Sequence, residues 1–481
     1  MRLSVRFGVV LLGGLLGSLY LFNAYVGRGA ARTRGVSARN QARQHAVRAA
    51  MQHAWGGYRR FAFGRDELQP LTQTGNDRWG NWSITLLDSL DTLRLMRLAE
   101  YDEAKRHVQH VDFGRSPDGF KVNVFEMIIR ALGGLLGAYE LDGDPMLLRK
   151  ADECAQTLVR AFGTPTGLNY ALMDVNDRGW TGGSRVSLAE AGTMQLEFKQ
   201  LARLTGRREY WRMAERVSEQ LEGGNRTEPG LYPMFVSVET GQYAPLPVYS
   251  VGAHADSFYE YLLKQHLLDG TAKYRARYEA ATDAIRTRLV GRTRGGLRFV
   301  GRLTADGVLV PEMEHLACFY PGLLALGAQA LGRPRDLRLA EELALTCVLA
   351  YNSTATGLAP EVAYFTDDAR VFEPVDPRYL LRPETVESLF VLYRVTGDPK
   401  YQDWGWQIFE AIERHARVAH GYAAVRNVLS AEMAANREDA MESFFLAETL
   451  KYLYLLFGPD DVLPLDKYVF TTEAHAFRKH T

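Results

Sequence analysis

The feature that most constrains the fold is a glycine turn that recurs along the chain. The turn glycines are Gly143, Gly206, Gly270, Gly332 and Gly397, so the steps are 63, 64, 62 and 65 residues. Each follows an apolar segment, and glycine readily adopts the left-handed conformation that ends a helix. A step of this length holds two helices with their connections. Fixed-period repetition without strand texture predicts a ring of helical hairpins.

Two further turns, near Glu100–Asp102 and at Gly458-Pro459-Asp460, extend the series to seven hairpins. Apolar residues at three- and four-residue spacing, for example in 127–139 and 316–331, indicate helices that are buried on more than one side. We therefore expect an all-α fold, an (α/α)7 barrel formed by residues 41–481. The longer polar connections lie on one side of the repeat, where loops usually carry the functional site.

The first 40 residues differ from the rest in composition. Residues 1–6 contain two arginines, 7–26 contain no charged side chain, and 27–40 are rich in Gly, Ala, Arg and Ser. About twenty apolar residues suffice for a helix to span a bilayer. We expect a cytoplasmic tail at 1–6, a transmembrane signal anchor at 7–26, a stem at 27–40 and a lumenal domain at 41–481. A cleaved signal peptide is the alternative.

Other signals favour a lumenal domain. Asn81-Trp82-Ser83, Asn225-Arg226-Thr227 and Asn352-Ser353-Thr354 match the N-glycosylation acceptor pattern. The three cysteines allow one disulfide and one remaining thiol, which suits an oxidising compartment. With 57 basic and 57 acidic residues and no dense basic block, the charge balance gives no support for nucleic acid as a partner. The expected location is the endoplasmic reticulum or Golgi membrane, in a single-pass type II orientation.

Acidic motifs recur where the expected helices start or end. They are Glu126 with Arg130, Glu190, Asp256 with Glu260, Glu384 with Glu387, Glu442 with Glu448, and Glu473. Each has an ordinary structural explanation as an i,i+4 ion pair, a helix cap or a complement to the helix dipole. In a ring of hairpins, however, these acids converge on one end of the axis. Paired carboxylates can cleave a glycosidic bond, and carboxylate and threonine oxygens suit calcium.

Together these motifs resemble the class I α-mannosidases, glycoside hydrolase family 47. The matching segments, in the family's order, are 87–93, 124–130, 188–190 with 196–198, 252–263, 315–322, 381–389, 441–452 and 468–475. The resemblance implies a calcium-dependent, inverting exo-hydrolase on an (α/α)7 barrel. Such an enzyme removes terminal α1,2-linked mannose from high-mannose N-glycans on glycoproteins, and we expect it to act as a monomer.

The resemblance also implies a role for each residue at a matching position. Glu384 is the expected general base, and Glu126 is the preferred general acid, with Asp256 as its competitor. An inverting pair needs roughly 6.5–9.5 Å between its carboxyl groups, because a water molecule lies between them. The expected calcium site has Thr472 as the direct ligand and, through waters, Glu190, Glu387, Glu448 and Glu473. The expected substrate-binding or carboxylate-orienting residues are Arg130, His254, His315, Arg382 and Phe444.

The same resemblance implies a disulfide between Cys318 and Cys347, which leaves Cys154 as a small buried residue. A second hypothesis keeps the fold and the pocket but not the chemistry. In it, the protein is a mannose-binding quality-control lectin of the endoplasmic reticulum with little or no hydrolase activity. A third, an unrelated α/α-toroid enzyme, requires the order of the motifs to be coincidence.

Overall fold

The computed structural model describes residues 35–176, 183–366 and 372–480. The predicted tail at 1–6 and anchor at 7–26, and most of the stem, lie outside these ranges. Within the described ranges, no helix has the length and apolar character needed to cross a membrane. The first described helix begins at Ala38, with Ser37 as its N-cap, so helical structure starts inside the predicted stem.

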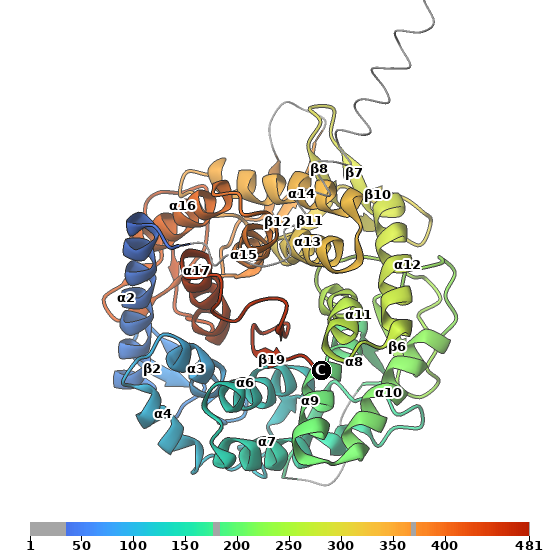
Figure 1. The fold of residues 1–481 in the computed structure, drawn as a ribbon, viewed down its shortest axis with the longest axis horizontal. Coiled ribbons are helices and arrows are strands. Elements are labelled where there is room, and N and C mark those ends of the chain that lie inside the picture. Colours follow the sequence, from blue (N-terminus) through green and yellow to red (C-terminus); the bar gives the residue numbers. More distant parts are fainter. Residues whose placement is uncertain (1–34, 177–182, 367–371, 481) are drawn as a thin grey trace, which may run out of the picture.

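The helices form two concentric rings (Figure 1). The inner ring comprises α3 (Ile84–Leu95), α6 (Gly133–Asp142), α9 (Gln195–Thr205), α11 (Asp256–Asp269), α13 (Tyr320–Leu331), α15 (Glu384–Thr396) and α17 (Leu450–Phe457). The outer ring comprises α2 (Ala38–Phe61), α4 (Tyr101–Val108), α7 (Pro145–Leu158), α10 (Arg208–Gly223), α12 (Ala272–Arg288), α14 (Pro334–Asn352) and α16 (Lys400–His415). Each inner helix from α3 to α15 packs against the outer helix that follows it, and α17 packs against α2.

Shorter helical segments lie between the long helices. They are α5 (Val124–Glu126), a π-helix at Met127–Leu132, α8 (Leu188–Gly192), 3-10 helices at Val159–Phe162 and His315–Phe319, and a π-helix at Phe445–Thr449. The two π-helices lead directly into α6 and α17. The second of them packs against α3, which closes the inner ring between the first and last inner helices.

The predicted glycine caps are confirmed at five inner helices. The C-caps of α6, α9, α11, α13 and α15 are Gly143, Gly206, Gly270, Gly332 and Gly397, with φ between 70° and 76°. The hairpin turn predicted at Gly458 is wrong, because its φ is −87° and the chain then enters the middle of the ring. The seventh pair therefore joins the two ends of the described domain, α2 and α17.

The two rings bury different amounts of helix surface. In α10, the buried residues recur at three- and four-residue spacing along one face, as expected for a helix with solvent on its other side. In α15, every residue from Glu384 to Tyr393 is buried. Inner helices have neighbours on all sides, so the ring encloses their charged side chains together with the apolar ones.

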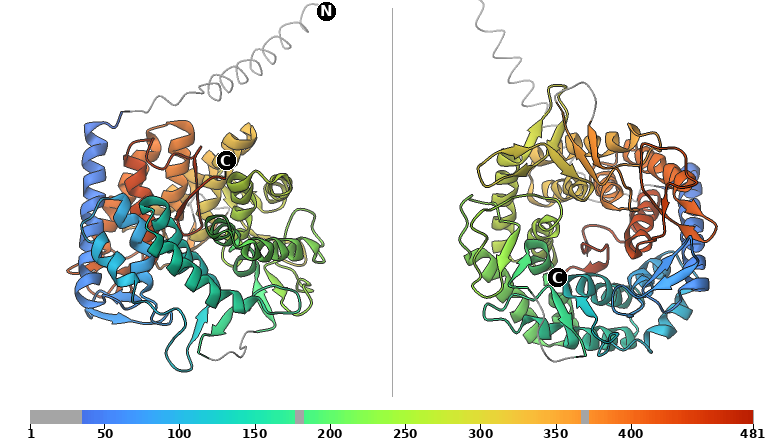
Figure 2. Two further views of the ribbon diagram at one scale, coloured as in Figure 1. Left: turned by 60° about the horizontal axis from the view of Figure 1, so that its bottom comes forward. Right: turned by 180° about the vertical axis from the view of Figure 1, so that it is seen from behind.

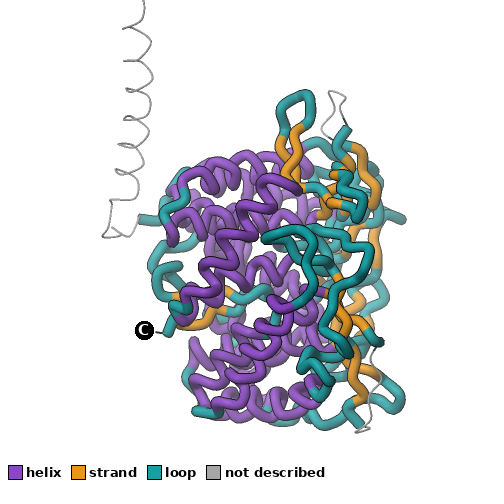
Figure 3. The backbone as a smooth tube through the Cα atoms, turned by 90° about the vertical axis from the view of Figure 1, so that its right-hand side faces the viewer, coloured by secondary structure: helices purple, strands orange, loops and turns teal. Residues whose placement is uncertain are grey.

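The two rings agree with the predicted (α/α)7 barrel, and short antiparallel strands that were not predicted occupy one end of the ring (Figure 3). The pairs are β1 (Glu67–Gln69) with β2 (Thr74–Asn76), β3 (Lys121–Asn123) with β4 (Leu172–Asp174), β5 (Arg185–Ser187) with β6 (Phe235–Ser237), β7 (Val290–Arg292) with β8 (Arg298–Val300), β9 (Arg302–Leu303) with β10 (Leu309–Val310), β14 (Arg417–Val418) with β15 (Gly421–Tyr422), and β16 (Ala424–Val425) with β17 (Arg437–Glu438). A three-stranded sheet holds β11 (Glu312–Glu314), β12 (Val362–Tyr364) and β13 (Glu373–Asp376). Strands this short show no readable alternation in sequence.

One further hairpin, β18 (Tyr468–Phe470) with β19 (Ala476–Arg478), lies inside the ring (Figures 1 and 2). Tyr468 pairs with Arg478 and Phe470 with Ala476. β18 packs against α11 and β19 packs against α6. The hairpin therefore places its turn, residues 471–475, among the inner helices.

The predicted disulfide is confirmed. Cys318, in the 3-10 helix before α13, is bonded to Cys347 of α14, so the bond ties an inner helix to its outer partner. Cys154 is free and buried in α7.

Candidate active site

Predicted catalytic carboxylates lie where inner helical segments begin. Glu384 is the first residue of α15, and Asp256 is the first residue of α11. Glu126 ends the short helix α5, whose N-cap Asn123 accepts a hydrogen bond from the Glu126 amide at 3.1 Å. Pro383 is the N-cap of α15.

Glu384 is held as an ionised carboxylate. His315 contacts Glu384 Oε2 through Nδ1 at 2.7 Å, and its Nε2 lies 2.8 Å from the hydroxyl of Tyr351. Burial opposes ionisation, but the hydrogen bond and charge of His315, together with the nearby Arg382, lower the pKa of Glu384 below its ordinary value. A carboxylate with this environment can accept a proton from water.

The pKa of Asp256 shifts in the opposite direction from that of Glu384. Burial, reinforced by the nearby carboxylates of Glu314, Glu260 and Glu384, raises the pKa of Asp256 to about 7. Its Oδ1 accepts a hydrogen bond from the Ser257 amide at 2.8 Å. The interpretation of Asp256 as a helix cap is wrong, because Ala255 is the N-cap and Asp256 lies inside the helix.

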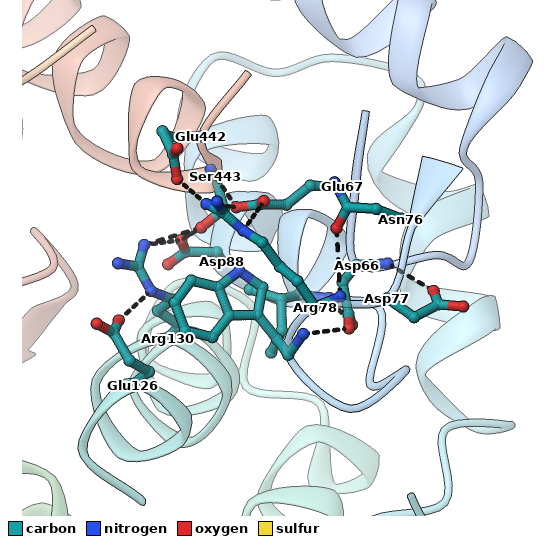
Figure 4. A network of polar contacts seen from close by, with 12 residues as sticks. Asp66, Glu67, Asn76, Asp77, Arg78, Asp88, Glu126, Arg130, Glu442 and Ser443 are labelled. Atoms are coloured by element: carbon teal, nitrogen blue, oxygen red, sulfur yellow. Dashed lines mark hydrogen bonds and ion pairs between the residues drawn. The ribbon is translucent and has the colours of Figure 1, made fainter. Parts of the chain in front are cut away.

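Arg130 connects Glu126 to Glu473, and Figure 4 shows its contact with Glu126. Its Nε lies 2.7 Å from Glu126 Oε2, and its Nη1 lies 2.5 Å from Glu473 Oε1. The same Nη1 donates to Ser443 Oγ at 2.9 Å. The predicted Glu126–Arg130 ion pair therefore exists, but it belongs to a buried network that also reaches the central hairpin.

Phe444 lies between two guanidinium groups. The centroid of its ring is 5.5 Å from Arg130 Cζ and 5.6 Å from Arg382 Cζ. Arg382 is fixed in turn by Glu361, whose Oε2 lies 2.7 Å from Arg382 Nε. Cations over an aromatic face are attracted by its quadrupole. The three side chains connect the Glu126 side of the site to the Glu384 side.

The residues predicted for calcium suit a hard cation. Burial, together with the neighbouring Glu473, Glu384 and Glu387, raises the pKa of Glu448 well above its ordinary value. Burial likewise raises the pKa of Glu387 to about 8, against the opposing effect of Lys264. Repelling buried carboxylates are stabilised by a cation, and oxygen donors match calcium. Across the described ranges, no three His, Cys, Asp or Glu side chains are grouped to hold a metal directly.

Two predicted site residues have other contacts. Glu190 forms a capping box with Ser187: its Oε2 accepts from the Ser187 amide at 2.9 Å, and its own amide donates to Ser187 Oγ at 3.2 Å. His254 is exposed, with a φ of 70°, and its ring lies 5.1 Å from that of Phe235. It lies beside the site, whereas the other predicted side chains are largely enclosed.

Some residues of the site were missed by sequence reasoning. Asp88 and Asp91 of α3 are buried, and His475 lies between them, with Nε2 at 3.2 Å from Asp88 Oδ1 and Nδ1 at 3.0 Å from Asp91 Oδ2. Two acids three residues apart in an otherwise apolar helix were a signal that could have found them. Tyr351 and Glu361 had no such signal, because only the fold brings them to His315 and Arg382.

The chain belongs to glycosyl hydrolase family 47, which residues 50–479 match. The endoplasmic reticulum mannosyl-oligosaccharide 1,2-alpha-mannosidase of Homo sapiens is 43% identical over 464 residues, covering 92% of this chain and 65% of the human protein. The mannosyl-oligosaccharide 1,2-alpha-mannosidase MNS1 of Arabidopsis thaliana is 41% identical, covering 91% of this chain and 78% of its own. The chain thus spans about two thirds of the length of the human relative.

The fold agrees with this family. The solved structure of an alpha-1,2-mannosidase from Trichoderma reesei matches with a TM-score of 0.87 and 33% sequence identity, covering 92% of this chain and 99% of that one. The family prediction made from the motifs is therefore confirmed over nearly all of the described residues.

Proposed function

We propose that this protein is an inverting, calcium-dependent glycoside hydrolase that removes terminal α1,2-linked mannose from high-mannose N-glycans. The observation that carries the proposal is the contrast between the carboxyl groups of Glu384 and Asp256. The pKa of Glu384 is lowered, whereas that of Asp256 is raised to about 7. Carboxyl groups whose environments separate their pKa values supply a base and an acid at the same pH. The names of the relatives supply the substrate class.

In the proposed reaction, Glu384 removes a proton from the attacking water, and His315 holds its carboxylate in place. Asp256 or Glu126 delivers a proton to the departing sugar oxygen. The ion pair between Glu126 and the guanidinium of Arg130 favours Asp256 as the acid. Arg382 and Phe444 would contact the sugar, since a guanidinium and an aromatic face suit hydroxyls and a sugar ring.

Calcium would be held by Thr472 directly and by Glu387, Glu448 and Glu473 through waters. When bound, it orients sugar hydroxyls and the attacking water. Glu190 completes the proposed set through the oxygen that its capping box leaves available. The proposal also includes a membrane anchor at 7–26, a lumenal domain and residence in the endoplasmic reticulum or Golgi. The protein is proposed to act as a monomer.

The test is incubation of a soluble 35–481 fragment with a nine-mannose N-glycan, followed by glycan mass analysis. We expect shortened glycans, and loss of product when calcium is removed with EDTA. The anomeric configuration of the released mannose, followed by NMR at early times, should be inverted. Binding without product would favour the lectin hypothesis, and turnover that survives EDTA would refute the role of calcium.

A further inference from the structure

The turn of the central hairpin is contacted by two buried lysines from two different inner helices. Lys451 of α17 donates from Nζ to the carbonyl oxygen of Ala474 at 2.8 Å. Lys264 of α11 lies 3.5 Å from the carbonyl oxygen of Thr471. These two carbonyls stand on either side of Thr472. The turn is thus held at both of its ends by ammonium groups.

Each lysine is also fixed by acids of the inner ring. Lys451 Nζ lies 2.9 Å from Asp91 Oδ2 of α3. Lys264 is paired with Glu260 of its own helix, and its Nζ lies 3.8 Å from Glu387 Oε1 of α15. The side chains of Lys264 and Lys451 are 5% and 1% exposed. Each ammonium group therefore joins the turn to a different pair of inner helices.

The turn combines internal hydrogen bonds, among them one from the Ala474 amide to the Thr471 carbonyl at 3.1 Å, with one uncommon backbone conformation. Ala474 has a φ of 59°, which is uncommon for a residue with a side chain and persists only where the surroundings enforce it. Inside the turn, the Thr471 amide donates to the His475 carbonyl at 2.8 Å. Lysine is almost never fully buried unless it is paired, and a buried ion pair can often be replaced by apolar side chains without loss of stability. Stability alone therefore does not explain two buried lysines aimed at backbone carbonyls.

We propose that Lys264 and Lys451 are positioning residues that clamp the 471–474 turn from both sides and so place the Thr472 oxygens for calcium. The inference depends on the proposed function only for the identity of the ion. Arg130 supports the same turn through Glu473, so cations from three segments of the inner wall converge on it. Because the clamp acts on backbone carbonyls, it orients Thr472 without occupying its side chain.

The test compares Lys264→Met and Lys451→Met with Lys199→Met. Lys199 of α9 is an internal control, because its side chain is also fully buried and its Nζ pairs with Glu215 at 2.7 Å and Asp269 at 3.1 Å, away from the turn. All three variants lose a buried ion pair and should show lowered melting temperatures. Calcium affinity is measured by isothermal titration calorimetry, and amide exchange of 471–475 by hydrogen–deuterium exchange mass spectrometry in calcium-free buffer.

We expect the two clamp variants to bind calcium about 10- to 100-fold more weakly, as is typical when the support of a metal ligand is removed. Exchange in the turn should be faster, and kcat should recover at high calcium. Lys199→Met should retain the calcium affinity, the turn protection and the activity of the parent. Unchanged calcium affinity and protection in the clamp variants would overturn the proposal, as would equal losses in Lys199→Met.

A variant that fails to fold is replaced by one without an unpaired charge. Lys264→Met is then combined with Glu260→Gln, and Lys451→Met with Asp91→Asn, and the same two measurements decide the proposal. If the parent binds calcium but releases no mannose, the proposed function fails while calcium affinity still tests the clamp. If the parent binds no calcium, the exchange of 471–475 alone decides whether the lysines hold the turn.

Discussion

Two ion pairs with the same four-residue spacing show how the inner and outer rings differ. On outer helix α12, Arg275 Nε lies 3.2 Å from Glu279 Oε1, and the side chains are 47% and 31% exposed. On the inner wall, Arg130 pairs with Glu126 while also binding Glu473 and Ser443, and its side chain is 8% exposed. Equal spacing in sequence thus produces a solvated pair in one ring and the centre of a buried network in the other.

The comparison predicts its largest effect at Glu384. We expect Glu384→Gln to lower kcat by about 10²- to 10⁴-fold, the range for loss of a general base, because the amide cannot accept the proton from water. The melting temperature should stay close to that of the parent. The matched change on the outer ring is Glu410→Gln in α16, an exposed position that should leave both quantities unchanged. Mannose release measures kcat, and circular dichroism measures the melting temperature. Turnover retained by Glu384→Gln would contradict the role of Glu384 as the general base.

The second effect concerns pH. Because burial raises the pKa of Asp256 to about 7, kcat/KM should fall as pH rises through 7 and the proton is lost. The folded state binds this proton more tightly than the unfolded state, so the group disfavours folding increasingly as pH rises from about 4 to 7. Asp256→Asn should lower kcat by about 10²-fold and abolish the alkaline limb.

A pH–rate profile of both proteins, with urea melts at pH 5 and pH 8, measures this effect. Asp256→Asn should gain more stability relative to the parent at pH 8 than at pH 5, because the cost of ionising Asp256 grows between about pH 4 and 7. An alkaline limb that persists in the variant would assign the proton to another group, with Glu126 as the next candidate.

The third effect compares the two ion pairs directly. Arg130→Met leaves Glu126 and Glu473 without their buried partner, so we expect a loss of about 3–5 kcal/mol in the free energy of unfolding. Arg275→Met should cost about 0.3–0.5 kcal/mol, because the pair is solvated. Urea denaturation of the two variants provides the measurement. Equal losses would mean that the stabilisation from an ion pair does not depend on whether it lies in the inner or the outer ring.

The fourth effect concerns two glycines, at which smaller losses are expected than at Arg130. A Cβ at Gly143 meets no atom, but its φ of 75° disfavours alanine, so Gly143→Ala should cost about 1 kcal/mol. A Cβ at Gly134 in α6 would collide with the backbone carbonyl of Leu87 in α3. Gly134→Ala should therefore cost more than Gly143→Ala in the same urea assay. The reverse order would argue against the close approach of these inner helices.

The repeat could be predicted from the sequence because it depends on the local backbone preference of its glycines. A glycine such as Gly270 ends a helix through its own backbone freedom, and that signal is visible without any neighbour. The turn predicted at Gly458 failed because the seventh pair is made by the chain's two ends. Short strands such as β16 were missed since two residues cannot show a period.

Site residues could be predicted from the sequence only where an acidic residue lies within an otherwise apolar segment. Glu384 and Glu126 were found in this way and through the family resemblance. Lys264 and Lys451 looked like ordinary polar residues of helices, and nothing near them in sequence indicates that both would meet the same turn. Their partners lie 207 and 23 residues away along the chain.

The sequence by itself determined the family, the repeat length, the glycine caps of five inner helices and the disulfide partners, because each depends on residue type, spacing or motif order. Only the tertiary structure decided which charges are buried, which of two carboxyl groups retains a proton near neutral pH, and which side chains support the central turn. Closing the ring removes water from the inner helices. Burial and charge neighbours then set the state of each ionisable group, and both are properties of the assembled barrel.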